Sequence, residues 1–274
     1  MALKDILIHI DNLDTCAARL DTAIKIAQAH DAYLIGLYVI PDFNIPAYAE
    51  VHIPVEIIAT QEEQARATAD QVKATFLKTA EQAGCAAAYH CVQGIAGQQI
   101  KRNTRFVDLT VISQTEEAHL LTENSDLPDR VVLGSASPVL CVPYIGAQHT
   151  IGQRVLIAWN GSREAARTVN DALPLLQRAE QVDVVAFNPP AGASDLPTVD
   201  ICDHLARHGV TAKGNQMTDK DIDVGDLILS RAADIGADLI VMGAYGHSRF
   251  RELILGGVTR HMLAHMTVPI LMSH

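Results

Sequence analysis

The chain alternates short apolar runs with longer stretches in which apolar residues recur every three or four positions. The runs of the first part cover residues 5–11, 33–40, 108–113 and 137–142, with a weaker one at 86–92. Runs of this length predict buried strands, and the longer period predicts helices between them. Because each crossover helix must pack back onto its sheet, this order predicts parallel sheets with helices on both faces.

The same order of elements occurs a second time. Asp5-Ile-Leu-Ile-His-Ile-Asp11 and Arg154-Val-Leu-Ile-Ala-Trp-Asn160 are both apolar runs that close on an Asp or Asn. The further runs of the second part cover residues 182–187, 210–217, 238–243 and 268–273. We therefore predict an α/β chain of two tandem, open, five-stranded parallel-sheet domains, residues 1–146 and 151–274, because the apolar pattern breaks between Tyr144 and Gln153.

An insertion distinguishes the first copy from the second. Residues 42–55, with Pro46 and Pro54, separate the second predicted strand from a long polar helix, which is predicted from about residue 56 to residue 83. The pattern fits a lid and a dimer-contact segment equally well.

Composition and charge narrow the class of protein. The 274 residues are 49% hydrophobic and 19% charged, enough for a sizeable core, and the net charge of -11 disfavours DNA or acidic membranes as partners. No apolar run approaches a membrane span and no signal-peptide pattern opens the chain, so we predict a cytoplasmic protein. The five cysteines contain no C-x-x-C pair, which argues against a disulfide framework or a zinc ribbon.

Glycines cluster after the apolar run 238–243, where the second-to-last predicted strand should end. Gly243 and Gly246 follow the run 238–243, and Gly256 and Gly257 precede the next predicted helix. Ligands of open parallel sheets bind beyond the carboxyl ends of the strands. There, glycines can adopt positive φ while successive N–H groups converge on an anion, and a helix N-terminus can hold a phosphate. Glycines after a strand are also ordinary turn residues, so both interpretations stay open.

These residues resemble those of a known family. Gly243-x-x-Gly246, nine residues, then Gly256 resembles the nucleotide motif of the universal stress protein family, and Ile157-Ala-Trp-Asn-Gly-Ser162 resembles its first-strand signature. The resemblance covers essentially the whole chain as two tandem copies. It implies domains of the adenine nucleotide α-hydrolase-like (HUP) type, frequent ATP binding, and dimers formed through the last strand.

The resemblance also implies an adenine-nucleotide site in the second copy. Gly243, Gly246 and Gly256 would contact ribose and phosphate. Gly257 stands where the family usually has Ser or Thr, and Thr259 replaces that hydroxyl only if the helix starts there.

At other positions of the implied site, the residue differs from the one usual in the family, or its place in the motif is defined less closely. Asn160 stands where many members have Asp, so it can hydrogen-bond a nucleotide but lacks a charge that would help to hold a metal. Val258 would pack beside the nucleotide and Phe187 would lie near the adenine. His247 and Arg249 follow the glycine pair, and Arg251 and Arg260 are further sources of positive charge. The complete predicted set is Asn160, Gly161, Ser162, Phe187, Gly243, Gly246, His247, Arg249, Gly256, Gly257, Val258 and Thr259.

The first copy departs further from the motif. Asp11 keeps the family's acidic residue, but residues 114–121 contain no glycine pair and include the carboxylates of Glu116 and Glu117. Because these carboxylates would repel a phosphate, we predict that this copy does not bind ATP and acts as a structural or regulatory partner.

The histidine pairs and Cys16 point less clearly to function. His204 with His208, and His261 with His265, have the i,i+4 spacing of helix neighbours, but no H-E-x-x-H pattern surrounds them, so we predict helix-surface residues and no metal site. Cys16 lies near the start of a predicted helix without a nearby resolving cysteine, and we predict an inert thiol.

No P-loop lysine motif, G-x-S-x-G or recognisable acid/base pair is present, so no catalytic residue is predicted. We predict a cytoplasmic stress-response protein that binds ATP, ADP or AMP, with or without Mg²⁺, as a switch for an unknown protein partner. Its assembly would be a homodimer or an intramolecular pseudo-dimer. Two alternatives stay open: a slow ATPase or other nucleotide-using enzyme, and an interaction module that binds no nucleotide.

Overall fold

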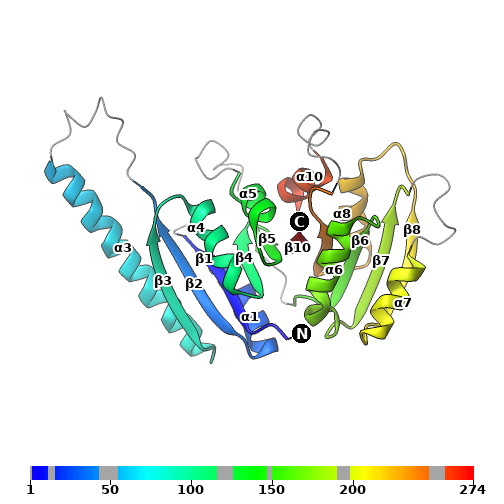
Figure 1. The fold of residues 1–274 in the computed structure, drawn as a ribbon, viewed down its shortest axis with the longest axis horizontal. Helices are drawn as coiled ribbons and strands as arrows, with labels where there is room; N and C mark the ends of the chain where they lie inside the picture. The colour runs from blue at the N-terminus through cyan, green and yellow to red at the C-terminus, as the bar shows by residue number, and fades with distance from the viewer. Residues whose placement is uncertain are drawn as a thin grey trace.

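The two halves of the chain share one sheet (Figure 1). The structure, a computed structural model, describes residues 2–11, 16–42, 55–115, 126–146, 150–189, 198–246 and 257–274, without the side chains of 55–59. Within them, ten strands run in the order β3-β2-β1-β4-β5-β10-β9-β6-β7-β8.

The helices and strands alternate in both halves as the sequence pattern predicts. The first half contains β1 (Asp5–Ile10), α1 (Cys16–His30), β2 (Tyr33–Ile40), α3 (Val55–Gln82), β3 (Ala87–Gln93), α4 (Ala96–Asn103), the short 3₁₀ helix η1 (Thr104–Phe106), β4 (Leu109–Ser113), α5 (Leu127–Gly134) and β5 (Val139–Val142). The second contains β6 (Arg154–Trp159), α6 (Arg163–Leu176), β7 (Gln181–Phe187), α7 (Val199–Arg207), β8 (Ala212–Met217), α8 (Val224–Asp234), β9 (Leu239–Gly243), α10 (Val258–His265) and β10 (Ile270–Ser273).

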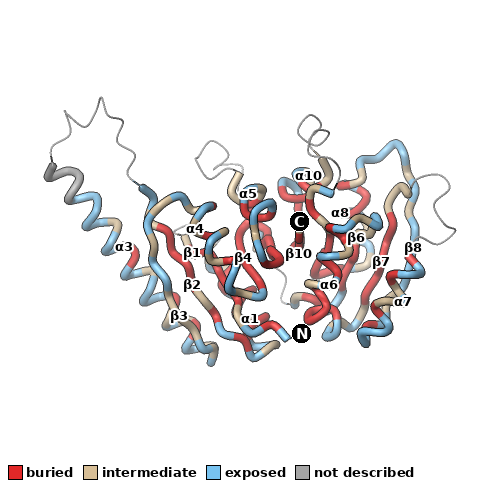
Figure 2. Tube along the Cα trace, viewed as in Figure 1, coloured by how far each residue is buried: buried red, intermediate tan, exposed pale blue. Residues whose placement is uncertain are grey.

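Each half has the parallel, doubly covered sheet that was predicted. β1 lies between β2 and β4, and β6 lies between β7 and β9, all in parallel register. Side chains of β1 alternate between two buried clusters: Ile6 and Ile8 join the cluster that contains residues of α1, α3, α6 and α7, and Leu7 joins the one that contains residues of α4, α5, α8 and α10. Figure 2 shows the central strands buried between these layers. The predicted α/β fold class is confirmed.

The last strands of the two halves pair with each other. β5 and β10 run antiparallel, with Cys141 opposite Ile270 and Val139 opposite Met272, whereas the other strand pairs of the sheet are parallel. The pairing through the last strand that the family resemblance implies therefore occurs inside one chain. No strand pattern in the sequence specified it, because the exposed edge of β5 offers the same backbone groups to any strand.

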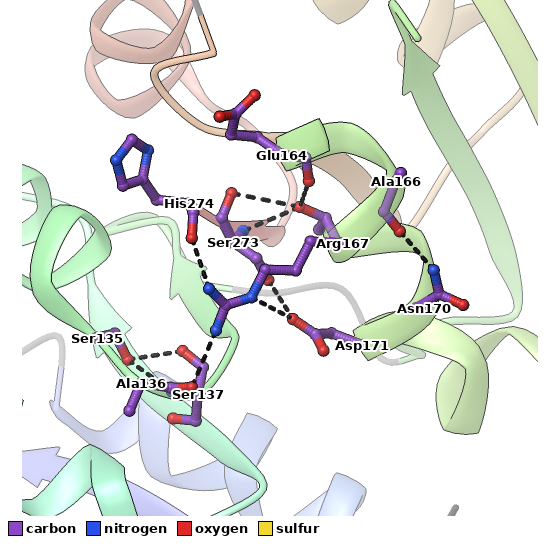
Figure 3. Close-up of polar contacts among 11 residues, drawn as sticks. Ser135, Ala136, Ser137, Glu164, Ala166, Arg167, Asn170, Asp171, Ser273 and His274 are labelled. Atoms are coloured by element: carbon purple, nitrogen blue, oxygen red, sulfur yellow. Dashed lines mark hydrogen bonds and ion pairs between the residues drawn. The ribbon is translucent and has the colours of Figure 1, made fainter. Parts of the chain in front are cut away.

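Arg167 of α6 reinforces this junction (Figure 3). Its Nη1 donates to the carbonyl oxygen of His274 at 2.8 Å, and its Nη2 donates to the carbonyl oxygen of Ala136 at 3.1 Å, in the other half. A second polar contact crosses nearby, where Gln114 Nε2 donates to the carbonyl oxygen of Ala264 at 2.8 Å. Arginine suits this position because its planar fork can reach two acceptors at once.

The helix predicted from about residue 56 to 83 is α3, which covers Val55–Gln82. Its Phe76 ring lies over Gly36 of β2, where a Cβ atom would approach the ring to 2.8 Å. The preceding insertion, apart from Asp42 and Val55 at its ends, lies outside the described residues. Whether it is a lid or a dimer-contact segment therefore stays open. Among the described helices, none combines the length and the apolar composition needed to cross a membrane.

One aspartate in each half ties two neighbouring strands together at their amino ends. Asp108, just before β4, accepts hydrogen bonds from the backbone N–H groups of Lys4 and Asp5. Asp238, just before β9, accepts them from Gln153 and Arg154 at 3.1 and 2.9 Å. The contact is therefore duplicated together with the fold.

We expect Asp238→Ala to destabilise the protein by roughly 2–3 kcal/mol, because it removes two charge-assisted hydrogen bonds from a buried aspartate. Asp108→Ala is the matched control, since that side chain makes the same contact in an exposed setting and should cost about 1 kcal/mol or less. Chemical denaturation of both variants measures the difference, and equal losses would contradict this account.

Candidate functional site

The predicted site residues of the second half lie at the carboxyl edge of its strands. Asn160, Gly161 and Ser162 follow β6, Phe187 ends β7, and the Gly243–Gly246 loop follows β9. Gly257, Val258 and Thr259 form the start of α10. His247, Arg249, Arg251 and Gly256 lie outside the described residues.

Asn160 and Ser162 build the turn from β6 into α6. The Asn160 side-chain oxygen accepts a hydrogen bond from the Ser162 N–H at 3.0 Å, and Ser162 Oγ caps the helix by accepting from the Ala165 N–H at 3.1 Å. Gly161 between them has φ of +71°, with open space where a Cβ would point. Both side-chain oxygens are thus engaged in the turn, and Asn160 presents its exposed amide group as the donor for a ligand.

Gly243 and Gly246 are needed for close packing against the start of α6. A Cβ atom on Gly243 would lie 2.4 Å from the Ala165 nitrogen, and one on Gly246 would lie 2.8 Å from Glu164 Oε2. Neither glycine has positive φ; the left-handed residue of the loop is Tyr245, with φ of +55°. The expectation that these glycines supply positive φ is wrong, because their physical role is to let the loop approach the α6 backbone and side chains.

The expected row of free N–H groups is also shorter than predicted. The Ala244 N–H donates to the carbonyl oxygen of Ser273 at 3.0 Å, which extends the pairing of β9 with β10. The Tyr245 N–H donates to Thr259 Oγ1 at 3.2 Å. Within the described residues, the N–H groups left to face an anion are those of Gly246 and of Val258 and Thr259 at the start of α10, whereas the Arg260 N–H donates to the carbonyl oxygen of Gly257 at 2.9 Å.

Thr259 connects the loop to α10. The helix begins at Val258, with Gly257 as its N-cap, so Thr259 is its second residue. Its side chain is buried, at 3% exposure, and its hydroxyl oxygen is the acceptor for Tyr245. Thr259 therefore positions the loop, and because the helix starts within one residue of it, its hydroxyl contact with a nucleotide stays a prediction.

Glu164 places a buried carboxylate at this edge, which the sequence analysis missed. The residue is 3% exposed, its Oε1 accepts a hydrogen bond from Arg163 Nε, and its Oε2 lies beside Gly246. Burial alone would raise the pKa of this carboxyl, but hydrogen bonds from Arg163, from the backbone and from Ser162 together hold it below its usual value. In sequence, Glu164 resembles any acidic residue in the first turn of a helix, where the helix dipole favours it.

The same edge of the first half is occupied by a buried ionic network. Arg19 of α1 is fully buried; its Nη2 donates to Asp11 Oδ1 at 2.9 Å and its Nη1 to Ser113 Oγ at 2.6 Å. Ser113 ends β4 as Gly243 ends β9. Among the described residues, the network places three side chains at this edge, which gives a second reason to expect no nucleotide there. Glu116 and Glu117, the basis of the original expectation, lie outside the described residues.

The two predicted histidine pairs lie as helix neighbours. The ring centroids of His204 and His208 lie 4.6 Å apart, as do those of His261 and His265. Within the residues that the structure describes, no group of three or more potential metal ligands comes together. A cavity of about 300 Å³ lies between α1 and α6 at the opposite end of the sheet, lined in part by Lys25, and it contains none of the predicted site residues.

Comparisons with known proteins agree with the duplicated architecture. The model of the Universal stress protein family matches residues 2–143 and again residues 152–274. Universal stress protein Slr1230 from Synechocystis sp. is 25% identical over 146 residues, a match that spans 52% of this chain and about half (49%) of that protein.

Two solved structures resemble the chain over nearly its full length. A universal stress protein from Archaeoglobus fulgidus DSM 4304 is 16% identical, with a TM-score of 0.77 and coverage of 98% of this chain and 95% of its own. A functionally unknown protein from Pseudomonas aeruginosa PAO1 is 14% identical, with a TM-score of 0.60 and coverage of 99% and 92%. At these identities the likeness shows the fold alone.

The buried network of the first half predicts a pH dependence of stability. Burial, together with the charge of Arg19, lowers the pKa of His9 from 6.5 to about 4, although Asp11 opposes the shift. His9 is therefore neutral in the fold but takes up a proton in the unfolded chain between pH 6.5 and about 4. The contribution of the neutral His9 to the free energy of unfolding is fully present above pH 6.5. It is lost as the pH falls from 6.5 to about 4, and the loss amounts to roughly 3 kcal/mol.

Denaturation of wild type and His9→Gln at pH 7 and pH 4 tests this prediction. We expect the variant to lose less stability between the two pH values than the wild type does. His208→Gln, at an exposed position, is the control and should keep the wild-type difference. A His9→Gln variant with an unchanged pH difference would show that His9 does not titrate as described.

Proposed function

The chain belongs to the universal stress protein family, and from that premise we propose that its second half binds an adenine nucleotide at the carboxyl edge of β6 and β9. ATP, ADP and AMP are the candidate ligands. Occupancy would act as a regulatory switch for another protein, since the residues that the structure describes at this edge include no catalytic acid/base pair.

The observation that carries this proposal is the convergence of three segments at one edge. A Cβ on Gly246 would lie 3.2 Å from Ser162 Oγ, so the glycine loop and the β6–α6 turn are in contact. Tyr245 and Thr259 join the same loop to α10 through their 3.2 Å hydrogen bond. The Asn160 amide, the Gly246 N–H and the N-terminal turn of α10 are therefore available on neighbouring segments, and an anion is favoured at such a helix terminus.

Glu164 makes the charge of this edge unlike that of a simple phosphate cradle. Its ionised carboxylate beside Gly246 would repel a bare phosphate. Mg²⁺ is usually held by one or two carboxylates together with the phosphates of its ligand, and here the Glu164 carboxylate supplies an oxygen donor of the required type. The proposed ligand is accordingly the Mg²⁺ complex of the nucleotide.

A second candidate function is supported by the same residues. The N–H groups of Ala244 and Tyr245 are already bonded inside the protein, and Glu164 occupies part of the edge. Both features favour an interaction module that binds no nucleotide, in which the Gly243–Gly246 loop serves only to pack against α6.

Equilibrium dialysis of the full chain with ATP, ADP and AMP, each with Mg²⁺, separates the two candidates. We expect at least one nucleotide to bind the wild type and binding to be lost in Gly246→Val, where the new side chain would meet Glu164 and Ser162. Gly97→Ala in α4 is the control, because its Cβ would have only ordinary contacts, with the nearest atom at 3.4 Å. If none of the three binds the wild type, the interaction module is the better account.

Glu164→Gln tests the role of the carboxylate. Without Mg²⁺, we expect this variant to bind ATP roughly tenfold more tightly than the wild type, because a negative charge beside the phosphate site is removed. With Mg²⁺ the advantage should vanish or reverse. Isothermal titration with and without the metal measures both, and Glu180→Gln, which removes a distant exposed carboxylate, is the matched control. An identical response of the two variants would contradict the assignment.

A further inference from the structure

A charged contact joins the two halves beside the proposed site. α5 precedes β5 as α10 precedes β10, so the pairing of these strands brings the two helices together around the junction (Figure 1). Asp129 is the third residue of α5 and Arg260 is the third residue of α10, and Arg260 Nε lies 3.5 Å from Asp129 Oδ1. Equivalent positions thus carry opposite charges. If α5 packed against a second α5, or α10 against a second α10, two aspartates or two arginines would face each other instead.

Asp129 also contacts the glycine loop itself. The Tyr245 hydroxyl donates a hydrogen bond to Asp129 Oδ1, across 116 positions of sequence. Tyr245 is the residue just before Gly246, and it is held from its backbone side by Thr259 and at its ring edge by His274, at a centroid distance of 6.3 Å. The first half therefore touches the loop that the proposed nucleotide would contact.

The contact with Asp129 helps to hold Tyr245 in an unusual backbone conformation. A residue other than glycine at a φ of +55° is uncommon and persists only where its surroundings determine it. The described surroundings come from both halves: Asp129 from the first, and Thr259 and His274 from the second. Removal of the Asp129 contact should loosen the loop.

Arg260 is a second partner of Asp129, and it is the more exposed of the two side chains. Its side chain is 55% exposed, whereas that of Asp129 is 23% exposed. It begins in the first turn of α10, whose N-terminus is the proposed phosphate position. A phosphate there would attract the guanidinium away from the carboxylate, because both are anions within reach of one cation.

We propose that Asp129 of the first half is a positioning residue for the site of the second half, which holds Tyr245 in place and competes with the bound phosphate for Arg260. The inference rests on the proposed nucleotide function. Ligand binding then weakens the contact between α5 and α10, and by linkage that contact limits ligand affinity by the same factor. The first half would in this way regulate the second without binding a nucleotide.

Two conservative variants separate the roles of Asp129. Asp129→Asn keeps an oxygen acceptor for the Tyr245 hydroxyl but removes the charge that holds Arg260, so we expect tighter binding of MgATP, by up to about fivefold. Tyr245→Phe removes only the hydroxyl, and we expect weaker binding. Both are measured by isothermal titration of the full chain.

A double-mutant cycle and a matched control make the test specific. In an Arg260→Met background, Asp129→Asn should no longer tighten binding, because the competition is gone. Asp126→Asn removes an equal charge from the residue before α5, where the carboxylate pairs with Arg130 at 2.6 Å, and it should leave affinity unchanged.

The outcomes distinguish this inference from the proposed function. A wild type that binds no nucleotide overturns both. If the wild type binds, three results overturn the role of Asp129 alone. They are a wild-type affinity for Asp129→Asn, a gain in affinity for Asp126→Asn as large as that for Asp129→Asn, and a gain for Asp129→Asn that persists in the Arg260→Met background. Faster amide hydrogen exchange in α5 on addition of MgATP would support the competition, and unchanged or slower exchange would contradict it.

Discussion

The antiparallel pairing of β5 with β10 is the constraint on which the rest of the molecule depends. It turns two five-stranded halves into one ten-stranded sheet and covers the edge that each half would otherwise expose. Because α5 and α10 precede the paired strands, it also sets Asp129 against Arg260 and against the loop that carries Tyr245. Arg167 strengthens the same junction by reaching acceptors in both halves.

The two halves use the same fold for different purposes. In the first half, Arg19 links Asp11 to Ser113 and places a buried ionic network at the carboxyl edge. In the second, the equivalent edge carries glycines, an exposed Asn160 and the N-terminal turn of α10. This difference fits our proposal that the first half supports and adjusts a site in the second.

Much of the fold could be predicted because strand patterns are local. The likeness of residues 5–11 to residues 154–160, and the order of apolar runs after each, specified two parallel α/β units. The β5–β10 pairing and the Tyr245–Asp129 contact could not be predicted, because backbone edges are chemically alike and the two residues lie 116 positions apart. The positive φ expected of the glycine pair was wrong, since only the three-dimensional packing reveals that Gly243 lies against the Ala165 backbone, and the expected ligand contact stays a prediction. Glu164 was missed because a first-turn acid is ordinary in any helix.

The most direct test of the central claim is an amide NMR titration of the ¹⁵N-labelled full chain with MgATP. The account predicts saturable shifts that are largest at Gly246, Val258 and Thr259, smaller shifts in α5, and none at Asp11 or Ser113. No saturable shift, or shifts that are largest at Asp11 and Ser113 in the first half, would contradict it.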